Sequence, residues 1–225
     1  MGSGEFQPWA GPAEIAAISV AHGDGSVAIL ATASAPEGEA VFQRWNEQGL
    51  RHYESLRIPA RVLAVRDRED AQDPETARSV RAASLVFFSG GNPSYLRATL
   101  VDTRLFSAIE ELLAAGGVYG GCSAGAMVAG AQLPGGRGLA RFAWGQGLSL
   151  VEGHIFGVHW DAPMMLPFRT VLSGRVPPDF QFLGIGEDTS IFSAAEGWLV
   201  SGKGAVEQRH EGRRQRYTAA ETIPY

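Results

Sequence analysis

Short apolar runs that alternate with helix-like segments limit this chain of 225 residues to a small set of folds. The runs at 26–33, 61–65 and 84–88 are apolar almost throughout, and a fourth, at 118–121, begins with the β-favouring pair Val-Tyr. Continuous apolar strands are typical of parallel sheets that are buried on both faces. The sequence therefore predicts an α/β fold: a three-layer, doubly wound, mostly parallel sheet with helices on both faces.

Capping residues mark the helices between these strands. Residues 39–50 carry apolar side chains near helical spacing. Asp73 and Asn92 each precede a proline, which is typical of a helix that begins with a side-chain cap. Thr103 is a third cap, and the glycines at 116–117 end its helix. The expected apolar face of that helix consists of Leu105, Phe106, Ile109, Leu112 and Leu113.

The second half of the chain predicts shorter elements and contains no linker or repeat. We expect an extended segment at 148–159, a short helix at 163–173, a strand at 182–186, a hairpin of 190–193 with 198–201, and a last strand at 205–208. The basic residues Arg213, Arg214 and Arg216 are expected on a solvated surface. One α/β domain over residues 1–225 is therefore expected.

Composition excludes several classes of protein. The net charge of −5 gives no basic face for nucleic acid. A single cysteine, Cys122, cannot form an intramolecular disulfide and fits the reducing cytoplasm. No apolar run is long enough to span a membrane, and no secretion signal is recognisable at the N-terminus. We expect a cytoplasmic monomer or homodimer. Residues 1–6 are either a cloning remnant or a native glycine-rich loop.

The segment 121–125, Gly-Cys-Ser-Ala-Gly, has the G-x-S-x-G pattern of a nucleophile elbow. In such an elbow the serine, here Ser123, lies in a strained turn between a strand and a helix, and its hydroxyl projects above the sheet. The glycines are needed because helix and strand backbones come too close for a Cβ. The alternative is a Gly-Ser turn that serves packing alone. Because the glycines at 90–91 also follow a strand, they are expected beside Ser123.

A nucleophilic serine needs a base and a group that orients the base. His159 ends an extended run, so its side chain can reach a site at the strand ends. His154 lies five residues earlier, on the opposite side of a regular strand, which argues against a shared metal. The orienting acid is expected directly after the strand at 182–186, as Glu187 or Asp188, with Asp161 as a rival. Hydrogen-bonded structural roles for these residues are the competing interpretation.

Taken together, these segments resemble the cyanophycinase and dipeptidase E family of serine peptidases, whose fold is similar to that of class I glutamine amidotransferases. The matching segments are 31–34, 87–92, 119–126, 184–189 and 202–206, in the order of the family. Residues 2–6 also look like the first glycine-rich loop of the family, which favours the native interpretation. The resemblance implies peptidase activity on short peptides or isopeptides, with neither cofactor nor metal.

The resemblance also implies a role for each matching residue. The nucleophile falls on Ser123, the base on His159, the acid on Glu187, the oxyanion-hole N–H groups on Gly91 and Ala124, and substrate binding on Asn92. Two features depart from the family: the segment 157–163 lacks the residues expected around the histidine, and the nearest following arginine is Arg169. An altered amidotransferase-like protein, with a binding or regulatory role or acting on another amide, is therefore the alternative function.

Overall fold

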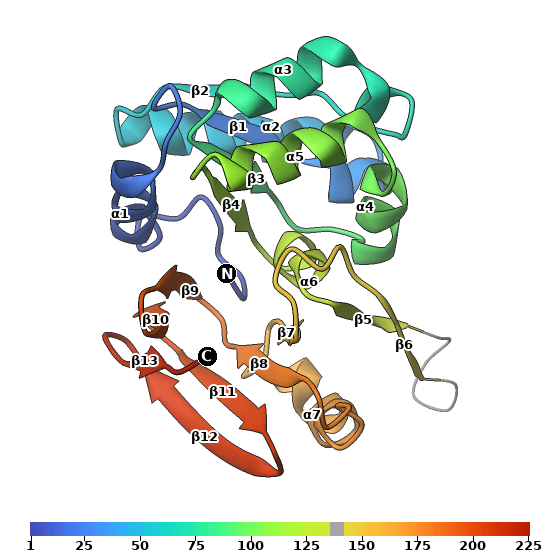
Figure 1. The fold of residues 1–225 in the computed structure, drawn as a ribbon, viewed down its shortest axis with the longest axis vertical. Helices are drawn as coiled ribbons and strands as arrows, with labels where there is room; N and C mark the ends of the chain where they lie inside the picture. Colours follow the sequence, from blue (N-terminus) through green and yellow to red (C-terminus); the bar gives the residue numbers. More distant parts are fainter. Residues whose placement is uncertain (136–141) are drawn as a thin grey trace. The chain divides into compact units, whose positions relative to one another are not determined.

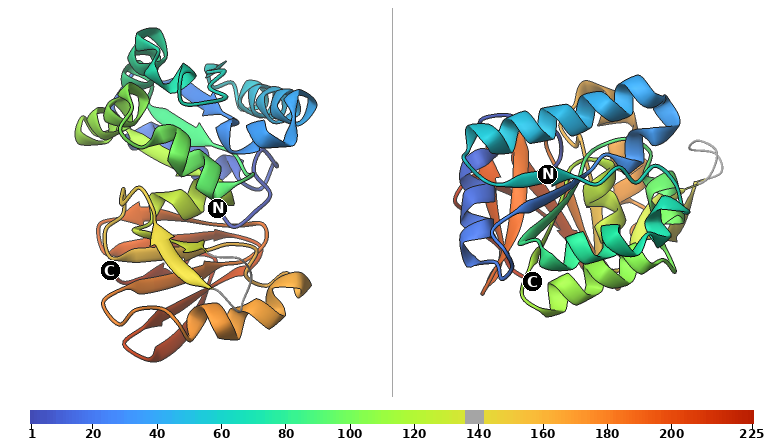
Figure 2. Two further views of the ribbon diagram at one scale, coloured as in Figure 1. Left: turned by 90° about the vertical axis from the view of Figure 1, so that its right-hand side faces the viewer. Right: turned by 90° about the horizontal axis from the view of Figure 1, so that it is seen from above.

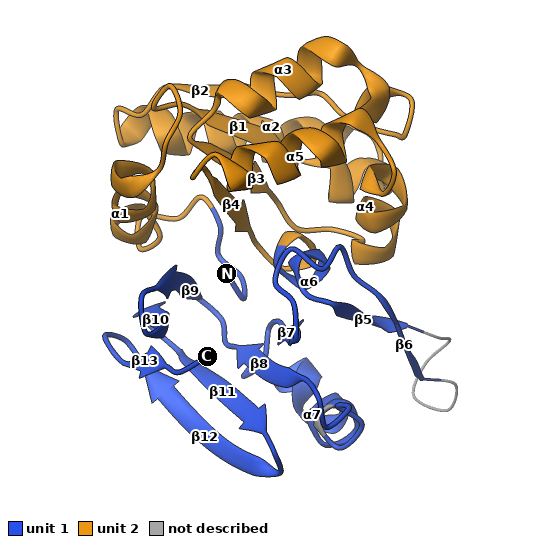
Figure 3. Cartoon of the chain, in the orientation of Figure 1, with its two compact units in different colours: residues 1–5, 126–225 blue, residues 6–125 orange. Residues whose placement is uncertain are grey.

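The computed structural model of the protein describes residues 1–135 and 142–225. The chain forms two compact units (Figure 3): unit 2 comprises residues 6–125, and unit 1 comprises residues 1–5 and 126–225. The boundary falls within helix α6 (Ala124–Ala129). The expectation of a single domain stays a prediction.

A parallel sheet in the order β2-β1-β3-β4 forms the centre of unit 2 (Figure 1). Its strands are β1 (Val27–Leu30), β2 (Ala60–Val62), β3 (Leu85–Phe88) and β4 (Val118–Gly121). Every residue of β1 and β3 is buried, which confirms the prediction made from their continuous apolar runs. All four strands run in the same direction, so their carboxyl ends share one edge of the sheet.

Helices cover both faces of this sheet. The helices of unit 2 are α1 (Gly11–Val20), α2 (Glu39–Ser55), α3 (Pro74–Ala82), α4 (Pro93–Leu100) and α5 (Arg104–Ala114), with 3-10 turns at Thr32–Glu37 and Asp70–Gln72. Helix α2 lies on one face of the sheet, and α3 and α5 lie on the other (Figure 2). The predicted α/β class with helices on both faces is confirmed.

The predicted side-chain caps are present at the start of three of these helices. The Asp73 carboxylate accepts hydrogen bonds from the N–H groups of Glu75 and Thr76. The side chains of Asn92 and Thr103 each accept a bond from the N–H three residues ahead. On α5 the buried side chains are Leu105, Ala108, Ile109 and Leu112. The predicted face is thus correct for three positions, whereas Phe106 and Leu113 are only half-buried.

Unit 1 contains mostly antiparallel strands. These are β5 (Gln132–Gly135), β6 (Ala143–Gln146), β7 (His154–Gly157), β8 (Gln181–Ile185), β9 (Thr189–Ala194), β10 (Gly197–Gly202), β11 (Ala205–His210), β12 (Arg213–Thr218) and β13 (Thr222–Ile223). They form a sheet in the order β12-β11-β8-β7, a second in the order β13-β10-β9, and the β5-β6 hairpin. The parallel pair is β7 with β8, and the predicted hairpin is confirmed as β9 with β10.

Two predictions for unit 1 need correction. Within the segment 148–159, only β7 is a strand, although Val151 also forms an isolated bridge to Gly130. The strand at 205–208 is not the last, because β11 pairs with β12 and β13 follows.

The short helix at 163–173 is present as a 3-10 turn (Pro163–Met165) followed by α7 (Leu166–Ser173). None of the helices in the described parts of the chain is long and apolar enough to cross a membrane.

Candidate active site

Ser123 occupies a tight turn between β4 and α6. Its φ angle is 49°, in the left-handed region that a serine rarely adopts. The turn is close to the neighbouring strand, because a Cβ on Gly125 would lie 2.3 Å from the carbonyl oxygen of Phe88. Cys122 is fully buried, and its N–H donates to that same carbonyl at 3.0 Å. Ser123 itself is half-buried, so the elbow geometry predicted from the sequence is present.

The glycine pair at 90–91 follows β3, the strand next to β4. In the register of the two strands Phe88 pairs with Gly121, so the loop after each strand begins at the same edge of the sheet. Gly91 has a φ of 140°, and a Cβ there would lie 2.3 Å from the carbonyl oxygen of Ala33. No other residue type fits this position. Asn92 uses its side-chain oxygen to cap α4, at 3.0 Å from the Tyr95 nitrogen.

The parallel pair of β7 and β8 brings His159 and Glu187 together in unit 1. Gly157 pairs with Gly184 near the ends of the two strands, and each side chain follows its strand by two residues. The N–H of Trp160 then donates to the Ile185 carbonyl at 3.0 Å, which fixes the loop that carries His159. His159 Nδ1 lies 2.7 Å from Glu187 Oε1. Since a carboxylate only accepts hydrogen bonds, Nδ1 is the protonated nitrogen of the neutral ring.

The three carboxylates that are candidates for the orienting acid have different hydrogen-bond partners. Glu187 contacts the histidine ring, whereas the Asp188 carboxylate accepts from Lys203 Nζ at 2.9 Å. Asp161 accepts the backbone N–H of Glu187 at 2.7 Å through Oδ1. Of the two neighbouring candidates for the orienting acid, Glu187 is therefore the one whose side chain contacts His159. Asp161 instead supports the backbone beneath it.

Ser3 is a contact of this pair that the sequence did not single out. Its hydroxyl donates to Glu187 Oε2 and accepts the N–H of Asp188 at 3.1 Å. The preceding Gly2 donates its N–H to the Thr189 carbonyl at 2.9 Å. Residues 1–5 are thus part of unit 1, and residues 2 and 3 are hydrogen-bonded to the segment around Glu187. Only the resemblance to the glycine-rich first loop of the family pointed to this segment.

A cavity of about 290 Å³ lies within unit 1. It is lined by Trp160, Asp161, Arg169, Ala205, Glu207, Arg214 and Arg216. Arg169, the first arginine after His159, is bonded to Glu207 at 2.7 Å and lies over the Trp160 ring at 5.4 Å. Burial raises the pKa of the Glu207 carboxyl, but hydrogen bonds from Arg209, Arg169 and Arg214 outweigh this effect and lower the pKa below its usual value of 4.5.

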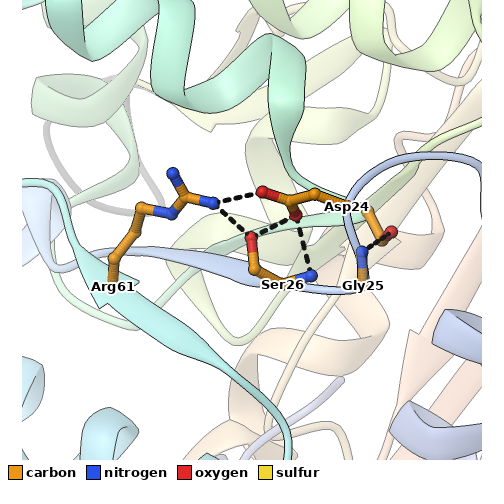
Figure 4. Close-up of polar contacts among 5 residues, drawn as sticks. Asp24, Gly25, Ser26 and Arg61 are labelled. Atoms are coloured by element: carbon orange, nitrogen blue, oxygen red, sulfur yellow. Dashed lines mark hydrogen bonds and ion pairs between the residues drawn. The ribbon is translucent and has the colours of Figure 1, made fainter.

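A second charged cluster lies in unit 2, at the edge of the sheet where the strands begin and thus opposite to the edge that carries Ser123 and Gly91 (Figure 4). Asp24 precedes β1, and its carboxylate accepts from the Ser26 N–H at 2.9 Å and from Arg61 at 2.5 Å. Burial opposes ionisation of Asp24, but the bonds from Ser26 and Arg61 outweigh it and lower the pKa. Because the cluster lies before a strand, whereas Ser123 and Gly91 follow strands, we assign it to stability.

His154, the other histidine considered in the sequence analysis, has both ring nitrogens in hydrogen bonds within unit 1. Its Nδ1 donates to the Glu152 carbonyl at 2.8 Å, and its Nε2 accepts from the Trp198 indole at 3.2 Å. Desolvation lowers the pKa of this ring, which favours its neutral form. In the described residues there is no group of three or more His, Cys, Asp or Glu side chains arranged to hold a metal.

Comparison with known proteins identifies the family. Residues 32–156 match the model of peptidase family S51, which is more than half of the chain and includes Ser123 and Gly91. The cyanophycinase of Geminocystis herdmanii is 30% identical over 197 residues, covering 81% of this chain and 68% of that protein. The cyanophycinase of Trichormus variabilis is 31% identical over 153 residues, 64% of this chain. The chain spans about half, 51%, of the length of that relative.

The structural comparison extends over the whole chain. The crystal structure of a peptidase from an acI-B1 actinobacterium has a TM-score of 0.91 and 30% sequence identity, and it covers 100% of this chain and 95% of that one. The resemblance to cyanophycinases and their relatives, and the fold that it implies, are thereby confirmed. The chain belongs to peptidase family S51.

Proposed function

We propose that the protein is a serine peptidase of the exopeptidase or dipeptidase type, which hydrolyses short peptides or isopeptides. Ser123 is the nucleophile, His159 the general base and Glu187 the acid that orients it. The N–H groups of Gly91 and Ala124 form the oxyanion hole, and Asn92 contributes to substrate binding. The proposal rests on the family and on the local geometry of each unit.

The pairing of His159 with Glu187 is the observation that carries this proposal. A carboxylate at 2.7 Å from Nδ1 holds the ring in the tautomer whose lone pair is on Nε2. That nitrogen can accept a proton from a serine hydroxyl, and the carboxylate then stabilises the imidazolium. Both side chains are partly exposed, 37% for His159 and 44% for Glu187, so the pair is accessible to a reacting group.

The reaction follows from these roles. Ser123 Oγ attacks the scissile carbonyl carbon while His159 Nε2 takes its proton. The carbonyl oxygen becomes an oxyanion that accepts from the two backbone N–H groups, and a donor of this kind is worth about 3–4 kcal/mol. His159 returns the proton to the leaving amine as the C–N bond breaks. Water, deprotonated by the same nitrogen, then hydrolyses the acyl-enzyme ester and restores the serine.

A fluorophosphonate probe tests the nucleophile directly. We expect the probe to label the wild type, and we expect labelling to be lost in Ser123→Ala and retained in the neighbouring control Cys122→Ala. Equal labelling of the wild type and Ser123→Ala would overturn the assignment. Hydrolysis of a dipeptide panel with acidic, neutral and basic residues at each position then identifies the substrate class, with His159→Ala as the inactive comparison.

The peptide panel and an assay of ammonia release from glutamine together distinguish the peptidase from the alternative function. An amidotransferase-like protein would release ammonia from glutamine and leave the peptides intact, and a regulatory protein would do neither. Either result, obtained with a folded wild type, would replace the peptidase proposal.

A further inference from the structure

The Glu187 carboxylate is held from both of its oxygens. Oε1 accepts from His159 at 2.7 Å, and Oε2 accepts from the Ser3 hydroxyl. The backbone at Glu187 is fixed separately, because its N–H donates to Asp161 at 2.7 Å. Two bonds on opposite oxygens define the plane of the carboxylate as well as its position.

Without Ser3, the contact of Oε1 with His159 would be the remaining side-chain hydrogen bond of the Glu187 carboxylate in the described part of the chain. Glutamate has three rotatable side-chain bonds, and the Glu187 side chain is 44% exposed, so a released carboxylate can turn towards water. The charged groups nearby do not replace the bond: the Asp188 carboxylate pairs with Lys203, and Asp161 is itself negative. The hydroxyl of Ser3 is therefore the contact that competes with solvent for Oε2.

The segment that carries Ser3 is itself tightly fixed. Ser3 is 8% exposed, and its hydroxyl oxygen also accepts the Asp188 N–H at 3.1 Å. Gly2 donates to the Thr189 carbonyl at 2.9 Å, and a Cβ on Gly2 would lie 2.1 Å from the carbonyl oxygen of Gly186. The loop at 2–3 thus packs directly against the backbone on both sides of Glu187.

We propose that Ser3 is a positioning residue of the active site, which holds the Glu187 carboxylate in the plane that orients His159. This inference rests on the proposed peptidase function. Ser3 acts through Glu187 and does not contact the reacting atoms. The loop at 2–3 would therefore contribute to catalysis through Glu187.

The test compares Ser3→Ala with Ser3→Thr, which keeps the hydroxyl. The matched control is Ser190→Ala, since Ser190 is also a buried serine of unit 1, and its hydroxyl lacks a hydrogen-bond partner among the described residues. We expect Ser3→Ala to lower kcat about tenfold with KM nearly unchanged. Ser3→Thr should recover most of the lost kcat, and Ser190→Ala should match the wild type. Thermal unfolding of each variant confirms that it folds.

A second measurement does not depend on activity. Crystal structures of the wild type and Ser3→Ala should show Glu187 against His159 in the first and rotated or in several conformers in the second. An unchanged Glu187 together with unchanged kcat would overturn the role of Ser3 while leaving the peptidase proposal intact. A wild type that hydrolyses no peptide would instead overturn the proposed function, and the crystal structures would still decide whether Ser3 positions Glu187.

Discussion

Three non-glycine residues at or directly next to the proposed catalytic positions adopt left-handed backbone conformations. The φ angles are 49° at Ser123, 53° at His159 and 48° at Asp188. Such conformations cost free energy and are concentrated at functional sites, where the surrounding structure imposes them. The G-x-S-x-G pattern predicted the first of these. Nothing in the sequence indicated the other two, because histidine and aspartate tolerate this region and therefore leave no glycine as a signal.

The choice of Glu187 over Asp188 leads to a prediction at the scale of one residue. Glu187→Gln removes the charge that stabilises the imidazolium of His159, so we expect kcat/KM to fall by about 10²–10⁴-fold. Asp188→Asn is the matched control, because its carboxylate forms an exposed ion pair with Lys203 that is worth at most about 1 kcal/mol. Steady-state hydrolysis of the best peptide of the panel measures both. A comparable loss in Asp188→Asn would contradict the assignment.

At the scale of the element, the sequence predicted best those parts that carry strong local signals. Strands β1 and β3 are continuous apolar runs, and the helices that begin after Asp73, Asn92 and Thr103 have side-chain caps. The elbow and the β9-β10 hairpin have turn residues at defined positions. Each of these features is determined by residues close together in the chain, so each is visible without knowledge of the tertiary contacts.

The elements that the sequence did not reveal depend on distant contacts. Helix α1 has no side-chain cap, and it is held by its buried Glu14, which lies 2.5 Å from His52 on α2. Strand β12 pairs with β11 through six residues, but its sequence is rich in exposed basic residues and lacks the apolar pattern of a strand. Such residues are typical of an edge strand. The contact of Ser3 with Glu187 spans 184 positions, and no local pattern encodes it.

Packing between β8 and the His159 loop gives a prediction for that element. A Cβ on Gly184 would lie 2.5 Å from the indole of Trp160, the residue after His159. We expect Gly184→Ala to displace this buried ring, to destabilise the fold by about 1–3 kcal/mol and to lower peptidase activity by moving His159. Urea unfolding and kcat/KM measure the two effects.

Gly145 supplies the control for this substitution. It also lies in a strand of unit 1, and the nearest atom to an added Cβ is 3.9 Å away. Gly145→Ala should therefore leave stability and activity close to those of the wild type. If Gly184→Ala is equally harmless, the fit of Trp160 against β8 does not position His159.

At the scale of the whole molecule, the proposed catalytic residues come from different parts of the chain. Ser123, Gly91 and Ala124 belong to unit 2, whereas His159 and Glu187 belong to unit 1, as does the positioning residue Ser3. The family match at 32–156 includes the first three and ends before His159. The support for His159 and Glu187 is therefore of a different kind: it comes from the register of β7 with β8 and from the 2.7 Å contact that this register produces.

Stability of unit 1 should depend on pH through the buried Glu207. Its carboxylate accepts from Arg209 at 2.9 Å, Arg169 at 2.7 Å and Arg214 at 2.6 Å, and these bonds lower its pKa below 4.5 despite the opposing effect of burial. An unfolded chain therefore binds a proton at a higher pH than the folded chain does. The stabilising contribution is complete above about pH 4.5 and is lost as the pH falls towards the lowered value.

Glu207→Gln tests this contribution. At pH 7 the variant leaves three arginines around a neutral amide, so we expect it to be about 2 kcal/mol less stable than the wild type. The difference should shrink as the pH is lowered from 5 to 3, because the wild type then loses the charge that the variant lacks. Urea unfolding across this range measures the difference, with Glu196→Gln in the exposed turn between β9 and β10 as the control. A difference that is independent of pH would show that Glu207 stabilises unit 1 by packing and not by its charge.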